Sequence, residues 1–287
     1  MGTTVVCWNI AKRHNAWREL AQMDADVALL QEAGNYPPDV ASKVDTGPRE
    51  HWDSHYWNSE WYGDRFRWLL ERWPKVVKLS DRVEVEWFKQ VSPISMTAED
   101  EIAVSGIGTI AAARVIPRDA APFIAVSMYA RWMSPHPSTK SRWRVGYPDG
   151  SAHRIISDLS AFIGGTDPST HRILAAGDLN MAFSGKDDDP FVLRERTVTD
   201  RMDVLGLEML YAEGRKADPT PDDLPADTRN VPTYHTTSQT PATATSQLDW
   251  VFASQGFHNG ITVRALNEVE EWGPSDHCRL LIEFAGD

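Results

Sequence analysis

Two spacings of apolar residues alternate along the 287-residue chain, and together they predict strands interleaved with helices. Continuous apolar runs bounded by turn residues are typical of buried strands. Such runs occur at residues 3–8, 27–30, 107–116, 123–129, 172–176, 248–253 and 278–284. A turn with Pro117 and Pro122 joins the runs 107–116 and 123–129, and this predicts a hairpin.

Three segments have helical spacing instead. Residues 16–23 form a short amphipathic segment that Asn15 is placed to cap. Residues 150–164 carry Ile155, Ile156 and Leu159 on one face, and Gly164 is suited to end that helix. Residues 192–205 are predicted to form the third helix.

Two stretches depart from this pattern. Residues 47–75 are crowded with tryptophan and tyrosine, and residues 214–247 are rich in Pro, Thr, Asp and Ser, which indicates an irregular surface loop. Neither has the composition of a flexible linker, so we expect one domain, 1–287, with an aromatic-rich insertion at about 47–75. That insertion could be a helix packed on the body or a lid that stacks on a substrate.

The charge and cysteine content narrow the class of protein. A net charge of -12 argues against a general polyanion-coating protein, but it suits an enzyme that holds a divalent cation with carboxylates. Cys7 and Cys278 lie in apolar runs, so buried reduced thiols are expected rather than a disulfide framework. The chain has neither a signal-peptide pattern nor an apolar run of roughly 20 residues, so we expect a cytoplasmic protein without a membrane segment.

Polar residues gather at the ends of the apolar runs. Taken singly, each is explained by the statistics of turns and caps. In an open α/β sheet, however, functional groups lie in the loops beyond the strand ends. The residues concerned are Asn9, Glu32, Tyr129, Asp178, Asn180, Asp249, Asp276 and His277.

As an ordered set, these residues carry a family resemblance. The motifs are Trp8-Asn9, Gln31-Glu32, Ser127-Met128-Tyr129, Gly177-Asp178-Leu179-Asn180, Leu248-Asp249-Trp250-Val251-Phe252 and Ser275-Asp276-His277-Cys278. The series resembles the endonuclease/exonuclease/phosphatase superfamily over essentially the whole chain. The resemblance implies an α/β (α+β) four-layer sandwich, in which two mixed β-sheets are flanked by helices and the site lies at one edge.

The resemblance also implies a metal site. Glu32 would be the main ligand with Asn9 beside it, and Asp249 would lie near the metal or a second metal. Oxygen ligands of this kind suit Mg²⁺, with Mn²⁺ as a substitute, and no Cys/His spacing suits zinc. We expect no obligate protein partner.

The remaining motif residues would act on the phosphate. By resemblance, Asp178 orients or deprotonates the attacking water and Asn180 holds a phosphate oxygen. His277 would contact the scissile phosphate, with Asp276 fixing its tautomer, and Tyr129 would contact the phosphate or leaving group. The set contains no covalent nucleophile, so in-line attack by water is expected.

The expected substrate is a nucleic acid, DNA or RNA. The segment that follows Tyr129 contains four residues that form a candidate substrate surface, because cations bind phosphates and aromatic rings stack on bases. They are Arg131, Trp132, Arg142 and Arg144, and a solvated loop is the alternative interpretation. Within the superfamily the motifs are nearest to abasic-site endonucleases, but the Pro and Asn of that branch are absent after Tyr129, where Ala130 to Trp132 stand.

Two other hypotheses remain open. The same chemistry could act on a small-molecule or lipid-headgroup phosphate, which the acidic net charge favours. The inositol phosphatase branch fits less well, because the Arg expected shortly after Asn180 and the Cys-Asp-Arg expected around Asp249 are missing. A catalytically silent binding module is disfavoured, since no motif position carries an inert residue.

Overall fold

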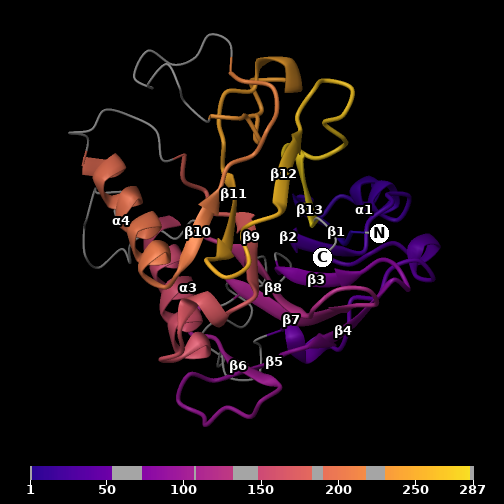
Figure 1. Ribbon diagram of the computed structural model, residues 1–287. Coiled ribbons are helices and arrows are strands. Elements are labelled where there is room, and N and C mark those ends of the chain that lie inside the picture. The colour runs from indigo at the N-terminus through magenta and orange to yellow at the C-terminus, as the bar shows by residue number, and fades with distance from the viewer. Residues whose placement is uncertain are drawn as a thin grey trace, which may run out of the picture.

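The computed structural model describes residues 2–53, 73–106, 108–131, 148–182, 190–217 and 230–284. Its strands form two large mixed sheets and one small one (Figure 1). Pairs β1–β2 and β8–β9 are parallel, and the other pairs within the large sheets are antiparallel. The five-stranded sheet has the order β12 (Ile261–Leu266), β13 (Arg279–Phe284), β1 (Thr4–Asn9), β2 (Val27–Gln31), β3 (Lys75–Lys78). The six-stranded sheet has the order β10 (Leu207–Leu210), β11 (Asp249–Ser254), β9 (Ile173–Asp178), β8 (Phe123–Tyr129), β7 (Ile110–Pro117), β4 (Val83–Trp87). The small sheet pairs β5 (Lys89–Val91) with β6 (Glu101–Ala103).

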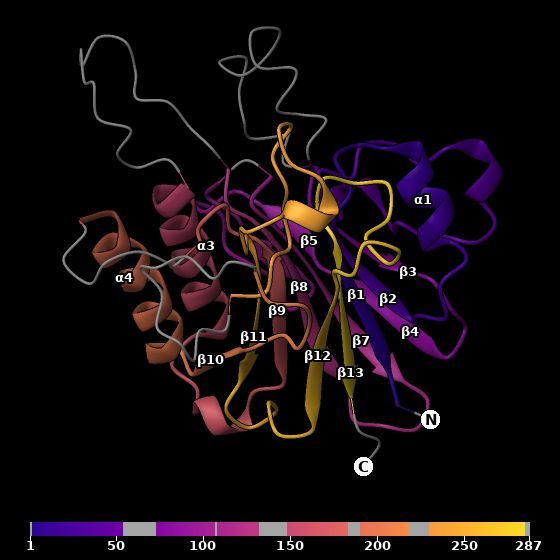
Figure 2. The ribbon, with the colours of Figure 1, turned by 90° about the horizontal axis from the view of Figure 1, so that it is seen from above.

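The two large sheets pack face to face and helices cover their outer faces. In β1, Val5 and Cys7 face the opposite sheet, whereas Val6 and Trp8 face α1 (His14–Leu20). On the other side, α3 (Pro148–Ile163) and α4 (Pro190–Val204) cover the six-stranded sheet (Figure 2). Strands buried on both faces need apolar residues throughout, which explains the continuous runs in the sequence. The expected four-layer sandwich is confirmed.

The strand register brings the predicted polar residues to one edge of the sandwich, which we call the catalytic edge. Asn9 pairs with Gln31 at the ends of parallel β1 and β2, and Tyr129 pairs with Asp178 at the ends of β8 and β9. Asp249 lies opposite Asp178 across the antiparallel pair β11–β9. Because β11 and β13 run antiparallel to their neighbours, it is their starts that reach this edge.

This arrangement corrects part of the sequence analysis. The polar motifs do not all follow a strand, because Asp249 opens β11, and Asp276 and His277 precede β13. The helix at 16–23 in fact spans His14–Leu20 with Arg13 at the N-cap, so Asn15 is not the cap. Strands β3, β4, β5, β6, β10 and β12 were not predicted.

The two irregular segments are described in part. Residues 54–72 of the aromatic-rich insertion lie outside the described residues. The loop expected at 214–247 is not confined to the surface, because Val231 and Thr233 are completely buried. No helix among the described residues is long and apolar enough to cross a membrane.

Candidate active site

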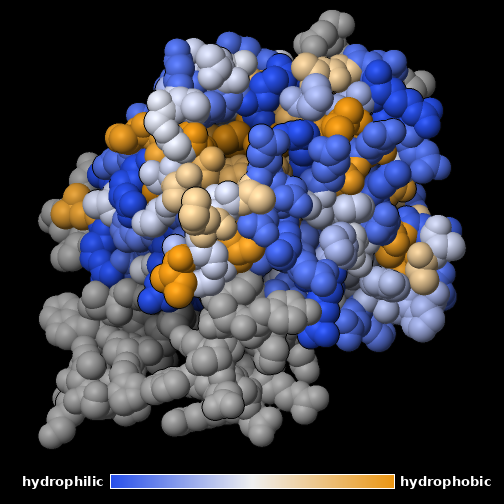
Figure 3. Space-filling model, turned by 90° about the horizontal axis from the view of Figure 1, so that it is seen from below, coloured by the Kyte–Doolittle hydropathy of each residue, from blue (hydrophilic) through white to orange (hydrophobic). Residues whose placement is uncertain are grey.

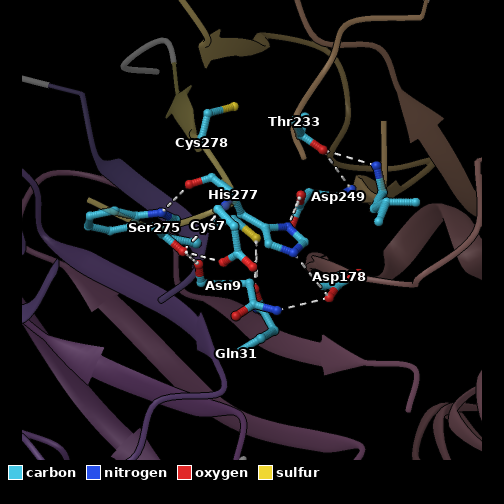
Figure 4. A network of polar contacts seen from close by, with 12 residues as sticks. Cys7, Asn9, Gln31, Asp178, Thr233, Asp249, Ser275, His277 and Cys278 are labelled. Atoms are coloured by element: carbon cyan, nitrogen blue, oxygen red, sulfur yellow. Dashed lines mark hydrogen bonds and ion pairs between the residues drawn. The ribbon is translucent and has the colours of Figure 1, made fainter. Parts of the chain in front are cut away.

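A buried histidine between two carboxylates forms the centre of the catalytic edge (Figure 4). His277 Nδ1 lies 2.8 Å from Asp249 Oδ2, and His277 Nε2 lies 3.8 Å from Asp178 Oδ2. All three side chains are buried, and the His277 carbonyl accepts a hydrogen bond from Trp8 Nε1. The ring is therefore held at one nitrogen by Asp249 and presents the other toward Asp178.

Charge dominates the titration of this group. Burial alone would lower the pKa of His277, but attraction to the carboxylates of Asp249 and then Asp178 outweighs burial and raises that pKa to about 10. Burial also raises the pKa of Asp178 to about 7; the nearby imidazolium opposes this increase and the Asp249 carboxylate adds to it. Near neutral pH the site therefore pairs an imidazolium with a carboxylate that can accept a proton.

Two asparagines brace Asp178. Asn9 Nδ2 donates to Asp178 Oδ2 at 2.9 Å, and the Asn180 backbone N–H donates to Oδ1 at 2.8 Å. Asn180 Nδ2 donates to both Asp178 Oδ2 and the Ala130 carbonyl, at 3.1 and 3.0 Å. Both hydrogens of that amide are thus used, so in this geometry Asn180 positions Asp178, and its expected contact with a phosphate oxygen would require these bonds to change.

Glu32 lies beside this group and is held by Tyr129. The Tyr129 hydroxyl donates to Glu32 Oε1 at 2.7 Å, joining the five-stranded sheet to the six-stranded one. Burial, and then the nearby Glu32 and Asp178 carboxylates, raise the pKa of the Tyr129 phenol. A neutral Tyr129 therefore orients Glu32, which is half-buried.

Left-handed backbone conformations concentrate at the same edge. In the described part of the chain, the non-glycine residues with positive φ are Ala11 (46°), Lys12 (59°), Glu32 (46°) and Asn180 (51°). All four follow closely on β1, β2 or β9. Such conformations are costly for residues with a Cβ and tend to occur where function requires a particular orientation.

The partner of the histidine differs from the sequence-based prediction. Asp276 was expected to fix the His277 tautomer, but Asp249 occupies that position. Asp276 Oδ1 instead accepts from Ser275 Oγ at 3.2 Å, and Ser275 Oγ also donates to the Asn9 carbonyl at 2.7 Å. Asp276 is half-buried and thus lies on the Asn9 side of the site.

Two site residues, Thr233 and Tyr234, were missed in the sequence. Thr233 Oγ1 accepts from the backbone N–H of Leu248 and Asp249, at 3.0 and 3.1 Å, and so fixes the start of β11. The Tyr234 ring lies 4.8 Å from the His277 ring. Both residues belong to a stretch that looked like a surface loop, and the only local signal was a Val231-Pro232-Thr233-Tyr234 run that resembles a short strand.

Tyr234 also lies near several carboxylates of the site. Partial burial raises the pKa of its phenol, and the carboxylates of Asp276, Asp178 and Glu32 raise it further. One phenol therefore lies within electrostatic reach of three carboxylates that come from three different parts of the sequence.

Of the predicted substrate residues, only Arg131 is described. It is buried, and its guanidinium carbon lies 5.6 Å from the Tyr129 ring centroid and 5.9 Å from that of Trp73. This places a cation behind the phenol that holds Glu32. Trp132, Arg142 and Arg144 lie outside the described residues, so their role stays a prediction.

The donor set fits a hard divalent cation. Ligand atoms of Asp178, Asp249 and His277 lie within 4.8 Å of one another, and Asp249 Oδ1 is buried without a hydrogen-bond partner among the described residues. Glu32 and Asp276 add two half-buried carboxylates. The set therefore combines several carboxylate oxygens with one imidazole nitrogen, and it can hold a divalent metal ion.

Comparison with known proteins identifies the fold. Neither a family model nor a curated protein matches the sequence. Among solved structures, the endonuclease domain of TRAS1, a telomere-specific non-LTR retrotransposon, superposes with a TM-score of 0.60 at 17% identity, covering 100% of this chain and 99% of that one. The AP endonuclease LMAP from Leishmania major gives 0.62 at 15% identity, with coverages of 100% and 88%. The chain has the endonuclease/exonuclease/phosphatase fold.

A third structure with this fold was solved with metal. A double mutant of beta toxin from Staphylococcus aureus, with bound magnesium ions, has a TM-score of 0.57 at 11% identity and covers 99% of this chain and 100% of its own. At such identities the endonuclease/exonuclease/phosphatase fold is what these proteins share with the chain. A shared fold does not determine activity, which depends on the chemistry of the site.

Proposed function

We propose that this protein is a magnesium-dependent phosphodiester hydrolase that acts on nucleic acid. The observation that supports the proposal most strongly is the buried His277 ring, with Asp249 on Nδ1 and Asp178 facing Nε2. In-line hydrolysis of a phosphodiester needs a base for water and a cation near the developing charge. Asp178 and His277 meet these two needs within one site.

The residues divide the work as follows. Asp178 accepts the proton of the attacking water, which its pKa of about 7 allows near neutrality. Protonated His277 donates a charge-assisted hydrogen bond from Nε2 to a phosphate oxygen, and Asp249 keeps the ring in place. Asn9 and Asn180 hold Asp178, and Tyr129 holds Glu32.

Glu32, Asn9 and Asp276 would hold the metal ion. We prefer Asp276 to Asp249 as a ligand, because Asp249 Oδ2 is already bonded to His277 Nδ1, whereas Asp276 lies on the Asn9 side of the site. When bound, Mg²⁺ supplies Lewis-acid stabilisation of charge on the phosphate. The magnesium ions bound to the beta toxin mutant, which shares this fold, support the choice of metal.

The preference for nucleic acid rests on two observations. The TRAS1 domain and LMAP are both endonucleases, and each superposes over the whole of this chain. In addition, Arg131 and Lys75 place buried cations beside the catalytic edge, where they favour a polyanionic substrate. The net charge of -12 instead favours a small phosphoester, which the test below therefore includes.

The test is a substrate panel assayed with Mg²⁺ or Mn²⁺ and with chelator. It contains single-stranded and duplex DNA, abasic-site DNA, RNA, inositol phosphates, nucleotides and sphingomyelin. We expect metal-dependent cleavage of at least one nucleic acid, lost in Asp178→Asn and His277→Ala, while His14→Ala, a substitution at an exposed histidine, is unaffected. Cleavage of only a small phosphoester would contradict the substrate class, and no metal-dependent cleavage of any member would contradict the hydrolase.

A further inference from the structure

A cavity lies at the edge of the sandwich opposite the catalytic edge. Strand β9 runs from Ile173 at this far edge to Asp178 at the catalytic edge. The cavity has a volume of about 450 Å³, within the range of small-molecule sites. Its lining includes Phe88, Arg114, Phe162, His171 and Arg172, contributed by segments on both sides of the six-stranded sheet.

Arg172 is the most unusual group in this lining. Its Nε is buried and has no hydrogen-bond partner in the part of the chain that the structure describes. The guanidinium carbon lies 4.5 Å from the Phe257 ring centroid. A ring can stabilise the face of a guanidinium, but it leaves the N–H groups at the edge unsatisfied. A buried donor without a partner destabilises the folded protein, and a bound acceptor would remove that cost.

His171 adds a second unsatisfied atom beside Arg172. Its Nδ1 is likewise buried without a partner among the described residues, while its Nε2 contacts the Thr166 hydroxyl. Arg114 lies at the rim with a side chain that is half exposed, 3.5 Å from Glu86. Glu99 is the acidic residue of the lining, but it is exposed, so solvent screens its charge. Arg114 is screened and paired in the same way, so Arg172 is the cation of this lining that would favour an anion.

The rest of the wall is apolar. Phe88 and Phe162 meet edge to face, with centroids 5.0 Å apart, and Ile124 and Ile163 extend the surface. Arg172 also borders a smaller hollow of about 210 Å³ next to Phe257. Figure 3 views the side of the molecule on which β5 and β6 lie, where apolar side chains gather in small groups between polar ones.

We propose that this far-edge cavity binds a small organic anion, a carboxylate or phosphate carried on an apolar body, with Arg172 as its anchor. The guanidinium edge and the His171 Nδ1 would hold the anionic group. The phenylalanine and isoleucine side chains would cover the apolar body. The site is separate from the candidate active site and does not depend on the proposed hydrolase function.

The binding test follows the Arg172 Nε–H signal by NMR, in metal-free buffer. The signal is assigned by its loss in Arg172→Gln. The probes are 3-phenylpropionate and phenyl phosphate, with the neutral 3-phenylpropanol and inorganic phosphate as comparisons, each titrated into the millimolar range. We expect saturable shifts of the signal with the two phenyl anions. Inorganic phosphate should bind at least tenfold more weakly than these anions, and the alcohol should cause no shift.

Variants show whether the response belongs to this cavity. Arg172→Gln should weaken binding at least tenfold, measured by calorimetry. Thr170→Glu, at an exposed position of the lining, should weaken it by repulsion without disturbing the core. Arg118→Ala, which removes an exposed arginine outside the lining, should leave binding unchanged. An unmoved Nε–H signal, equal affinity for inorganic phosphate and the phenyl anions, or unchanged binding in both Arg172→Gln and Thr170→Glu would each overturn the proposal.

Discussion

Two buried histidines in this protein titrate in opposite directions. His277 at the catalytic edge and His51 near the start of the aromatic-rich insertion are both almost fully buried. Attraction to two carboxylates overcomes burial and raises the pKa of His277 to about 10. Burial lowers the pKa of His51 to about 3, because only the Pro48 carbonyl favours its charged form and Lys75 opposes it.

The difference lies in the neighbours rather than in the depth of burial. His51 contacts backbone groups: Nδ1 lies 3.0 Å from the Pro48 carbonyl, and Nε2 accepts from the Val76 N–H at 3.3 Å. It is a neutral link between a short loop and β3. His277 instead contacts two buried carboxylates, and burying such charges costs desolvation energy that a purely structural contact does not require. A buried histidine therefore indicates a catalytic site only when its partners are charged.

The largest predicted effect comes from removing the charge that makes His277 different. Asp249→Asn keeps the size of the side chain but removes the anion on Nδ1, so activity should fall roughly 10³-fold. Asp276→Asn should act on the metal instead, raising the Mg²⁺ concentration needed for half-maximal rate. Initial rates across a Mg²⁺ titration distinguish the two variants. If excess Mg²⁺ restored Asp249→Asn but not Asp276→Asn, the two roles would be exchanged.

The roles of Asp249 and Asp276 could not be predicted from the sequence, although much of the fold could. The strands at 3–8, 123–129 and 172–176 follow from apolar runs, because burial on both faces leaves a local signature. The choice between Asp249 and Asp276 as partner of His277 has no local signature, since it depends on β11 lying beside β9. The sequence suggested Asp276 because it is adjacent to His277 along the chain, whereas Asp249 is adjacent to it in space.

Other omissions have similar causes. Strands β4 and β12 alternate buried and exposed residues, so they lack the continuous apolar runs from which the other strands were predicted. Thr233 and Tyr234 lie in a stretch rich in turn-forming residues, and only the tertiary contacts of the chain bury Thr233 beneath β11. The motif residues themselves were predictable because the six motifs, taken together and in their order along the chain, carry the family resemblance.

The second prediction concerns the stability contributed by a neutral His51. Its folded-state pKa lies below the unfolded value, so the unfolded state binds more protons between pH 6.5 and about 3, and stability falls as pH decreases through that window. Between pH 7 and 4 this residue should cost roughly 3 kcal/mol. His51→Gln keeps a donor and an acceptor but cannot titrate, so its unfolding free energy should fall less on acidification.

Denaturant unfolding at a series of pH values measures this difference. His14→Gln is the matched control, because it makes the same substitution at an exposed histidine. Equal acid slopes for the wild type and His51→Gln would mean that His51 is solvated and that burial does not set its pKa.

A smaller effect is expected at the link between the two sheets. Tyr129→Phe removes the hydroxyl that donates to Glu32 at 2.7 Å, and loss of a group that orients a metal ligand typically costs 10–100-fold in affinity or activity. We expect about a tenfold loss in kcat/KM with a raised Mg²⁺ requirement. Tyr36→Phe, at an exposed ring, is the control. An unchanged Mg²⁺ titration in Tyr129→Phe would show that Tyr129 does not position Glu32.

The smallest effect concerns Lys75, the cation that opposes protonation of His51. Burial lowers its pKa to about 8, although Nζ donates to the Gly34 carbonyl at 2.8 Å and lies 4.1 Å from the Trp52 ring centroid. The unfolded state therefore binds more protons between about pH 8 and 10.5, so the wild type should gain stability as pH rises through that window. Because the ring and carbonyl contacts offset part of the burial cost, we expect a gain of about 1 kcal/mol.

Lys75→Met should lack this gain, as measured by urea unfolding at pH 7.5 and 9.5, whereas Lys43→Met, at an exposed position, should retain it. If Lys75→Met gained as much as the wild type, Lys75 would be titrating as a solvated residue, and the contrast between His51 and His277 would have to rest on the carboxylates alone.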